Sequence, residues 1–214
     1  MQSLRRVRPA DTSFGRERGL PIDRYYGERF IADHAGLIRG DVLEVGDDRY
    51  TRAHGSGVRS SAVLHAEEGN PQATIVGDLA SGRGLPEGQA YDCVILYDTL
   101  QCIYDVPAAV ATGHRLLRPG GSVLATFNGI AQISRFDYDH WGEFWRPTDL
   151  AVSRLFSESF GAANVTVATH GNVLAACGLL YGLAAEEIGP RRLDHHDPDY
   201  QVCITACATR QPAS

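Results

Sequence analysis

The length and composition of the chain indicate one globular domain. Its 214 residues allow a single well-packed core, and its 43% hydrophobic and 21% charged residues argue against disorder and against a membrane protein. A net charge of −6 argues against nucleic acid as a partner, because nucleic-acid binding needs a basic face. There is no bilayer-length apolar run and no signal peptide, which predicts a cytoplasmic protein without a membrane partner.

The N-terminal part divides into an arm and a helix. Residues 1–20 are polar and rich in arginine, and we expect a loosely held arm before a single domain over residues 21–214. A helix is predicted from about 23 to 38, because apolar and aromatic residues recur there at spacings of mostly three or four and Gly40 follows. The sequence VLEVG, residues 42–46, is then typical of a strand that ends in a glycine turn.

Apolar, β-branched runs alternate with amphipathic stretches along the rest of the chain. Helices are predicted at 105–119 and 147–161, and the apolar run 172–188 predicts either a core helix or a helix that forms a homodimer. This alternation indicates βαβ units and a doubly wound parallel sheet covered on both faces. The further strands are predicted at 62–66, 73–77, 91–97, 121–127, 164–170 and 200–209.

A candidate nucleoside site lies beyond the strand ends, where doubly wound sheets bind ligands. Gly46 ends the first strand and lets a ligand approach the backbone, although an ordinary tight turn is the alternative. Glu67 comes 21 residues later and can accept both hydroxyls of a ribose. Asp78 and Leu79 follow the third strand, where Asp78 can accept from an adenine amino group. Each acid alone fits a helix cap or a loop, whereas the four together in this order favour a nucleoside site.

These motifs resemble those of the class I S-adenosylmethionine-dependent methyltransferases over most of the chain. VLEVG resembles the first motif of that family, Glu67 its ribose-binding acid, and GDL its adenine-side motif. YDCVILYDTLQCI resembles its fourth-strand motif, and HRLLRPGGSVLATF its helix, glycine turn and fifth strand. The resemblance implies a Rossmann-like seven-stranded sheet in the order 3-2-1-4-5-7-6 with the last strand antiparallel, and S-adenosylmethionine as the cofactor.

The segment FGRERGLPIDRYYGERF resembles a helix that lies over the cofactor in a poorly characterised bacterial subgroup of small-molecule methyltransferases. Some members of that subgroup are associated with glycosyltransferases. The resemblance implies that Tyr25, on this helix, contacts the cofactor.

The chain departs from the family where further glycines of the first motif are expected, since Asp47 to Tyr50 stand there. The carboxylates would repel the carboxylate of the cofactor, while Glu44 or Asp47 can receive its ammonium group. The retained Glu44 and Gly46 indicate an altered but competent site. An arginine can pair with the cofactor carboxylate, and three are candidates: Arg24, Arg49 and Arg52.

The segment from about 128 to 148 is predicted to cover the site as a lid. Methyl transfer from a sulfonium needs alignment and exclusion of water, and a base only for a hydroxyl or a cationic amine. His140 is the first candidate base, because histidine side chains in general can exchange a proton near neutral pH, although a capping or solvent-facing histidine is an equal alternative. The other candidates are Tyr97 at the reacting centre, Gln101 and Asn128 as groups that orient the acceptor, and Trp141 and Trp145 as an apolar wall.

The leading hypothesis is a methyltransferase that acts on a small molecule, most simply on an oxygen of a sugar or a specialised metabolite. Two alternatives stay open: a fold that has lost methyl transfer and serves as a binding or scaffold protein, and a cofactor-dependent cyclase or isomerase. No metal site is expected, because the cysteines include no CxxC pair and His195–His196–Asp197 lacks a spaced third ligand.

Overall fold

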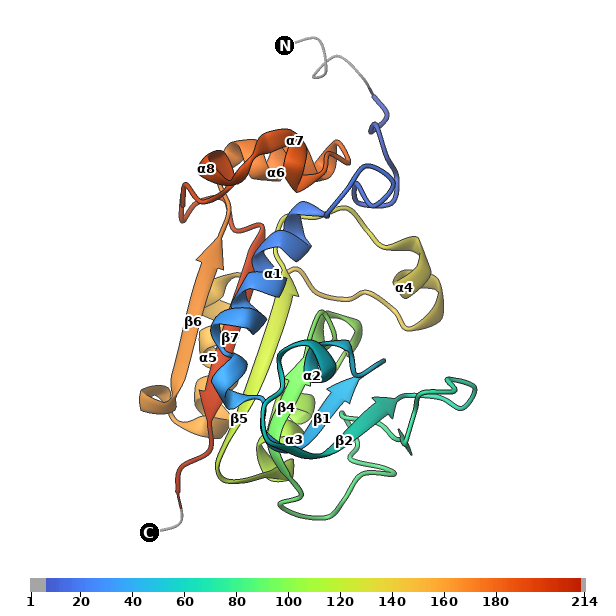
Figure 1. The fold of residues 1–214 in the computed structure, drawn as a ribbon, viewed down its shortest axis with the longest axis vertical. Helices are drawn as coiled ribbons and strands as arrows, with labels where there is room; N and C mark the ends of the chain where they lie inside the picture. Colours follow the sequence, from blue (N-terminus) through green and yellow to red (C-terminus); the bar gives the residue numbers. More distant parts are fainter. Residues whose placement is uncertain (1–6, 213–214) are drawn as a thin grey trace.

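The computed structural model describes residues 7–212, which form an α/β fold around one seven-stranded sheet (Figure 1). The strand order is β3-β2-β1-β4-β5-β7-β6, and β7 runs antiparallel to both β5 and β6. The predicted fold class, strand order and antiparallel last strand are thus confirmed. The strands are β1 Gly40–Val45, β2 Val58–His65, β3 Ile75–Val76, β4 Tyr91–Leu96, β5 Leu117–Asn128, β6 Val165–His170 and β7 Cys203–Thr209.

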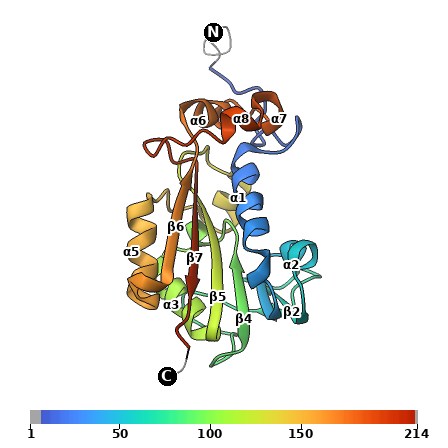
Figure 2. The same cartoon turned by 60° about the vertical axis from the view of Figure 1, so that its left-hand side comes forward.

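Helices cover the two faces of the sheet unequally (Figure 2). On one face lie α3 (Val106–Leu116) and α5 (Asp149–Phe160), and on the other lie α1 (Ile22–Asp33) and α2 (Arg49–His54). Three short helices gather at one end of the molecule: α6 Val173–Leu180, α7 Ala185–Ile188 and α8 Pro190–Leu193. The remaining elements are α4 Arg135–His140 and the 3₁₀ turns η2 Ala35–Leu37, η3 Leu100–Cys102 and η4 Ala162–Asn164. Within residues 7–212, no helix has the length and apolarity needed to cross a membrane.

Local sequence explains where the main helices begin and end. The Asp105 side chain accepts a hydrogen bond from the Ala108 N–H and caps α3, while Asn172 caps α6 in the same way. Gly161 ends α5 with a φ of +79°, a conformation that glycine adopts without strain. The largest core lies between the sheet and the α3–α5 face, with Phe127 and Phe156 fully buried in it.

Several predicted boundaries differ from the observed ones. Helix α1 ends at Asp33, and the chain continues as a 3₁₀ turn rather than as an α-helix to residue 38. The predicted helix 172–188 is broken after Leu180, because Gly182 takes a φ of +68° and Ala184 bridges to Pro21. The homodimer stays a prediction. No helix lies between β2 and β3 or between β3 and β4, where the sequence is rich in glycine and proline, so these two connections are not βαβ units.

The described part of the arm is attached to the C-terminal helices rather than loosely held. The Ala10 N–H donates to the Tyr181 carbonyl, and Arg18 pairs with Glu187. Asp11 is buried and accepts from two backbone N–H groups of the arm itself. The arm therefore belongs to the folded domain from residue 7 onward, and residues 1–6 lie outside the described part.

Candidate functional site

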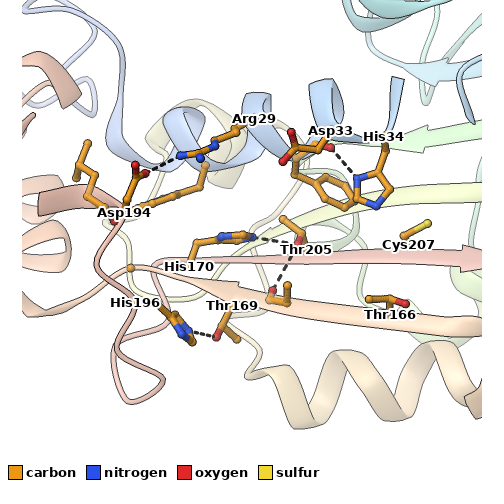
Figure 3. Close-up of a pocket in the computed structure, with 15 residues that line it drawn as sticks. Arg29, Asp33, His34, Thr166, Thr169, His170, Asp194, His196, Thr205 and Cys207 are labelled. Atoms are coloured by element: carbon orange, nitrogen blue, oxygen red, sulfur yellow. Dashed lines mark hydrogen bonds and ion pairs between the residues drawn. The ribbon is translucent and has the colours of Figure 1, made fainter. Parts of the chain in front are cut away.

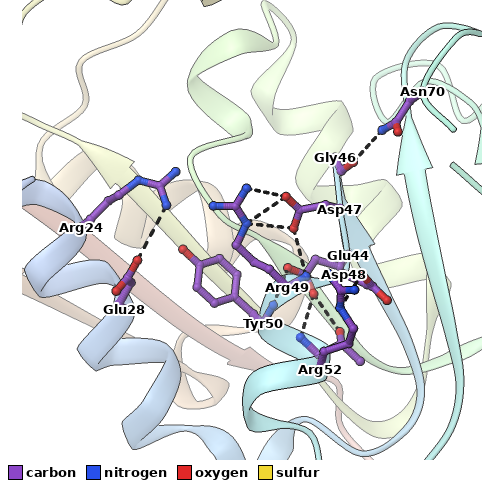
Figure 4. A network of polar contacts seen from close by, with 11 residues as sticks. Arg24, Glu28, Glu44, Gly46, Asp47, Asp48, Arg49, Tyr50, Arg52 and Asn70 are labelled. Atoms are coloured by element: carbon purple, nitrogen blue, oxygen red, sulfur yellow. Dashed lines mark hydrogen bonds and ion pairs between the residues drawn. The ribbon is translucent and has the colours of Figure 1, made fainter. Parts of the chain in front are cut away.

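The stretch VLEVGDDRYTR forms the end of β1, a glycine turn and helix α2, which the sequence pattern did not predict (Figure 4). The buried Glu44 carboxylate accepts from the N–H groups of Tyr50 (3.1 Å) and Thr51 (2.9 Å) and from the Thr51 hydroxyl (2.8 Å). Burial raises the pKa of Glu44, although these hydrogen bonds oppose the rise. Glu44 thus satisfies the free N–H groups at the start of α2, so it does not stand free to receive an ammonium group.

The two aspartates of the turn are also held by the chain itself (Figure 4). Asp47 accepts two hydrogen bonds from Arg49 Nε, at 3.0 and 2.8 Å, and Asp48 pairs with Arg52 at 3.0 Å. Burial raises the pKa of Asp47, but the Arg49 hydrogen bonds outweigh burial and hold the pKa below its ordinary value. Arg24 on α1 is held less tightly, since its contact with Glu28 is 3.7 Å long. Of the three candidate arginines, Arg24 is therefore the most available for a ligand carboxylate.

The space beyond Gly46 is open. Gly46 has a φ of +88°, and a Cβ built on it would meet no atom within 4 Å. Its carbonyl accepts from the Asn70 side chain at 2.6 Å, which fixes the turn. Glu67 is exposed beyond the end of β2, and the described residues offer its carboxylate no hydrogen bond. The open space beside the Gly46 backbone and the exposed Glu67 carboxylate fit the nucleoside part of a cofactor.

The two residues of the adenine-side motif, Asp78 and Leu79, both make contacts within the protein. Asp78 accepts from the Ala80 N–H at 2.8 Å and from the Ser81 hydroxyl at 2.7 Å, and the Ser81 hydrogen bond lowers its pKa. Leu79 is buried in the large core. Asp78 therefore shapes the turn after β3, and its contact with a cofactor stays a prediction.

Tyr97 lies at the end of β4, under α1. Its ring centroid is 4.7 Å from that of Tyr50, and the Arg24 guanidinium lies 5.8 Å from its ring. The Tyr97 hydroxyl points at Gly27, where a Cβ would collide with it. Burial raises the pKa of Tyr97 well above its ordinary value, so the phenol stays neutral and can only donate or accept a hydrogen bond.

Asp98, which the sequence reasoning missed, follows Tyr97 with a strained φ of +47°. Its N–H donates to Thr126 Oγ1 on β5 at 2.8 Å, and the Thr126 hydroxyl donates back to Asp98 Oδ1 at 2.9 Å. Burial, together with the buried Asp23 carboxyl on α1, raises the pKa of Asp98 to about 7. Its only sequence signal is an acid directly after the apolar fourth strand.

Gln101 and Asn128, which are predicted to orient the acceptor, lie close to each other. Both are buried, and Gln101 Oε1 accepts from the Asn128 N–H at 3.4 Å. Within the described residues, the buried Asn128 Oδ1 has no hydrogen-bond partner. Buried polar atoms are rarely left unpaired, so this atom points to a donor supplied by a ligand.

The segment 128–148 crosses this end of the sheet and is tied down at several points. The Trp141 ring packs edge-on against His65 at 5.2 Å, at the end of β2. The Trp145 Nε1–H donates to the carbonyls of Ile103 (3.1 Å) and Tyr104 (3.2 Å). Trp141 therefore lies beside the end of β2, while Trp145 anchors the segment, and the contact of either ring with an acceptor stays a prediction.

Two predicted site residues face elsewhere. His140 is exposed on α4, stacks on Phe136, and has its Nδ1 2.7 Å from the Phe136 carbonyl. The Tyr25 hydroxyl donates to Asp194 at 2.8 Å, toward the C-terminal helices. The structure thus brings neither side chain to the cluster around Tyr97 and Asp98. The periodicity of a single segment does not show which way such side chains face.

A separate groove of about 420 Å³ lies between α1, the edge strand β6 and its neighbour β7 (Figure 3). Six of its polar side chains are bonded in pairs: Arg29 with Asp194, His170 with Thr205, and His196 with Thr169. The residues that line the groove do not include the ends of β1 and β4. We therefore assign the candidate site to the strand ends.

Comparisons with known proteins concern the family and the fold. Residues 40–125 match a family described as a methyltransferase domain, and no curated protein sequence matches the chain. The N-methyltransferase NodS from Bradyrhizobium japonicum, in complex with S-adenosyl-L-homocysteine, is similar at a TM-score of 0.54 and 12% identity, over 94% of this chain and 93% of NodS.

Two further solved structures share the fold. The methyltransferase partner of the Haloferax volcanii Trm112 activator has a TM-score of 0.55 and 15% identity, over 96% of this chain and 100% of its own. Phosphoethanolamine N-methyltransferase 2 from Haemonchus contortus, in complex with S-adenosyl-L-methionine, has a TM-score of 0.54 and 14% identity, over 87% of this chain and 53% of its own. Residues 40–125 therefore match a methyltransferase-domain family, and the sheet has the Rossmann-like strand order of the methyltransferase fold.

Proposed function

We propose that this protein transfers a methyl group from S-adenosylmethionine to a hydroxyl group of a small molecule, such as a sugar or a specialised metabolite. The observation that carries the proposal is the cluster of unsatisfied hydrogen-bond acceptors at the ends of β4 and β5. Asn128 Oδ1 has no donor among the described residues, and the Asp98 carboxyl, which is bonded to Thr126 on the same strand as Asn128, keeps one oxygen without a donor among them. A hydroxyl-rich molecule supplies the donors that this cluster lacks.

The cofactor half of the site is formed by β1, β2 and α1. Glu67 would bind the ribose, Arg24 the carboxylate, and the open space beyond Gly46 would take the cofactor backbone. Trp141 would cover the nucleoside from the lid segment. When bound, the cofactor supplies an electrophilic methyl group on a sulfonium. NodS and the Haemonchus contortus enzyme, which were crystallised with S-adenosylhomocysteine and S-adenosylmethionine, support this assignment.

A small acceptor suits this site better than a macromolecule. Helix α1 lies over Tyr97, and the lid segment is tied to η3 by the hydrogen bond from the Phe144 N–H to the Gln101 carbonyl. Both features restrict access to the strand ends and exclude water from the reacting groups. The net charge of −6 also argues against a polyanionic acceptor.

Calorimetric titration with S-adenosylmethionine and S-adenosylhomocysteine tests the cofactor site. Gly46→Val is expected to weaken S-adenosylhomocysteine binding at least about tenfold, because its side chain would fill the open space beyond β1. Gly189→Val is a matched control, since Gly189 has a φ of +85°, similar to the +88° of Gly46, and equally open surroundings. Both variants carry the same backbone strain, so equal losses of affinity would contradict the assignment.

Methyl transfer itself is tested by the release of S-adenosylhomocysteine with a panel of sugars and phenols. Release in step with a methylated product is expected. Cofactor binding without product from any hydroxyl compound would contradict O-methylation and favour a cyclase or isomerase. A wild-type protein that binds neither cofactor form would favour the non-catalytic alternative.

A further inference from the structure

The position of Asp98 in the sheet brings its carboxyl to the centre of the site. The register of β1 with β4 pairs Glu44 with Ile95, so Gly46 and Tyr97 lie at the same level two residues further on. Thr126 and Asn128 alternate with Phe127, which is buried on the α3–α5 face, so both point toward α1. Asp98, bound to Thr126, therefore lies under α1 between the cofactor turn and Asn128.

The contacts of Asp98 hold its backbone and one carboxylate oxygen and leave the other oxygen free. The N–H and Oδ1 are both bonded to the Thr126 side chain, whereas the described residues give Oδ2 no donor. Asp98 also keeps part of its surface accessible, although it lies deep among α1, β4 and β5. An oriented carboxyl with one free, accessible oxygen can exchange a proton with a bound molecule.

The charges around Asp98 are mainly acidic. The groups that interact with it electrostatically are Asp23 and Arg24 on α1, Tyr50 on α2, Tyr97 at the end of β4, Asp137 on α4, the Cys102 thiol on η3 and the Cys203 thiol on β7. Asp23 is buried, and its carboxyl accepts from the neighbouring Arg24 N–H. Two buried carboxyls close to each other resist double ionisation, so one of them keeps a proton to a higher pH than an ordinary aspartate does.

Resting on the proposed function, we infer that Asp98 is the catalytic residue that accepts the proton of the acceptor hydroxyl, and that Asp23 is a positioning residue that acts through Asp98. The hydroxyl oxygen forms the new bond to the methyl carbon as the carbon–sulfur bond breaks and the sulfur keeps that electron pair. The hydroxyl proton passes to Asp98 Oδ2. The buried Asn128 Oδ1 accepts a hydrogen bond from a second donor of the acceptor molecule.

The protonation of Asp98 suits this role near neutral pH. Because burial and Asp23 raise its pKa to about 7, the carboxylate is the stronger base that general base catalysis requires, and it is still largely ionised above that pH. His140, the base candidate from the sequence, is exposed and packs on Phe136 instead. The assignment therefore moves from the lid to the end of β4.

The first test follows the carboxyl groups directly by carbon NMR of aspartate-labelled protein, with and without S-adenosylhomocysteine. One aspartate is expected to titrate near pH 7 and to vanish in Asp98→Asn. Asp98→Asn keeps the acceptor oxygen and the N–H that bind Thr126, so the fold is expected to persist. If every aspartate titrates near its ordinary pKa, about 4, the inference is overturned, whether or not an acceptor is known.

Two variants are expected to move this titration in opposite directions. Asp23→Asn removes a neighbouring negative charge and shifts the Asp98 pKa down, while Thr126→Val removes a hydrogen bond to the carboxylate and shifts it up. Asp139→Asn on the exposed surface of α4 is the control and leaves it unchanged. Unchanged titration in both test variants would show that Asp98 is not the titrating group.

The second test measures S-adenosylhomocysteine release with methyl glucoside and catechol as hydroxyl probes. Wild-type turnover is expected to rise with pH and to level off above about 7, and Asp98→Asn to lose about 10²-fold or more in kcat and this pH dependence. Affinity for S-adenosylhomocysteine stays within about twofold. An Asp98→Asn enzyme with wild-type turnover overturns the inference. A wild-type protein without cofactor affinity contradicts the proposed function instead, and the NMR titration then decides on Asp98 alone.

Discussion

The two halves of the site use their acidic groups in opposite ways. In the cofactor half, Glu44, Asp47 and Asp78 each accept hydrogen bonds from nearby N–H, hydroxyl or guanidinium groups of the chain. In the acceptor half, Asp98 keeps one oxygen without a donor, and Asn128 Oδ1 has none among the described residues. An acid satisfied by its own chain maintains the local structure, whereas a buried polar atom left unsatisfied marks the place where a ligand is expected.

The largest expected effect is on stability in the cofactor half. Glu44→Ala leaves two N–H groups and a hydroxyl at the start of α2 without their acceptor, which we expect to cost about 3 kcal/mol. Asp47→Ala removes a half-exposed ion pair and one hydrogen bond from the Arg49 N–H, and it is expected to cost less, about 1 kcal/mol. Urea denaturation of both variants measures the difference. Equal losses would show that Glu44 is not the structural acid of this turn.

A smaller effect is expected from pH in the acceptor half. The folded-state pKa of Asp98 is about 7, above that of the unfolded chain, so its contribution to stability is complete below pH 4 and is lost as pH rises through 7. Between pH 5 and 8, wild type is expected to lose about 2 kcal/mol of unfolding free energy relative to Asp98→Asn. Urea denaturation of the two proteins at both pH values isolates Asp98 from the other titrating groups. If the unfolding free energies of the two proteins change with pH by the same amount, the pKa of Asp98 is not raised by folding.

The smallest expected effect concerns Glu67, the exposed acid of the cofactor half. Glu67→Ala is expected to weaken S-adenosylhomocysteine binding by about tenfold, or 1.4 kcal/mol, without changing stability. Asp78→Ala is expected to lower stability without changing the affinity for S-adenosylhomocysteine, because the Asp78 carboxylate holds the turn through Ala80 and Ser81. Calorimetry and thermal unfolding of both variants separate binding from folding. A stability loss in Glu67→Ala would remove the distinction between the two acids.

The sheet was predictable because each strand has a local sequence pattern and the family resemblance gives the order of the strands. Alternating apolar runs located all seven strands within a few residues, and the resemblance supplied their order. Helix α2 was not predictable, since its N-terminal donors are satisfied by Glu44 from the preceding strand and not by a cap at Asp48. The break in helix 172–188 depends on the bridge from Ala184 to Pro21, which is distant in sequence.

The site was predictable only in part for the same reason. Tyr97 and Gln101 follow β4 and Asn128 ends β5, and the parallel pairing of these two strands brings Gln101 and Asn128 together. Asp98 gains its unusual character from burial under α1, which no spacing in the sequence encodes. The direction of His140 is set by the fold of the lid segment, where Trp145 is anchored on the carbonyls of Ile103 and Tyr104.

The absence of a side chain at Gly27 lets helix α1 lie close to Tyr97 at the end of β4. A methyl group at this position would collide with the Tyr97 hydroxyl, so any other residue must lift the helix or turn the ring aside. Either movement would change the distance between α1 and the end of β4, where we propose that the acceptor binds. Under the proposed function, a substitution at residue 27 would therefore change the size of the acceptor that fits, without replacing Asp98 or Asn128. Substrate size and proton transfer would then depend on different residues.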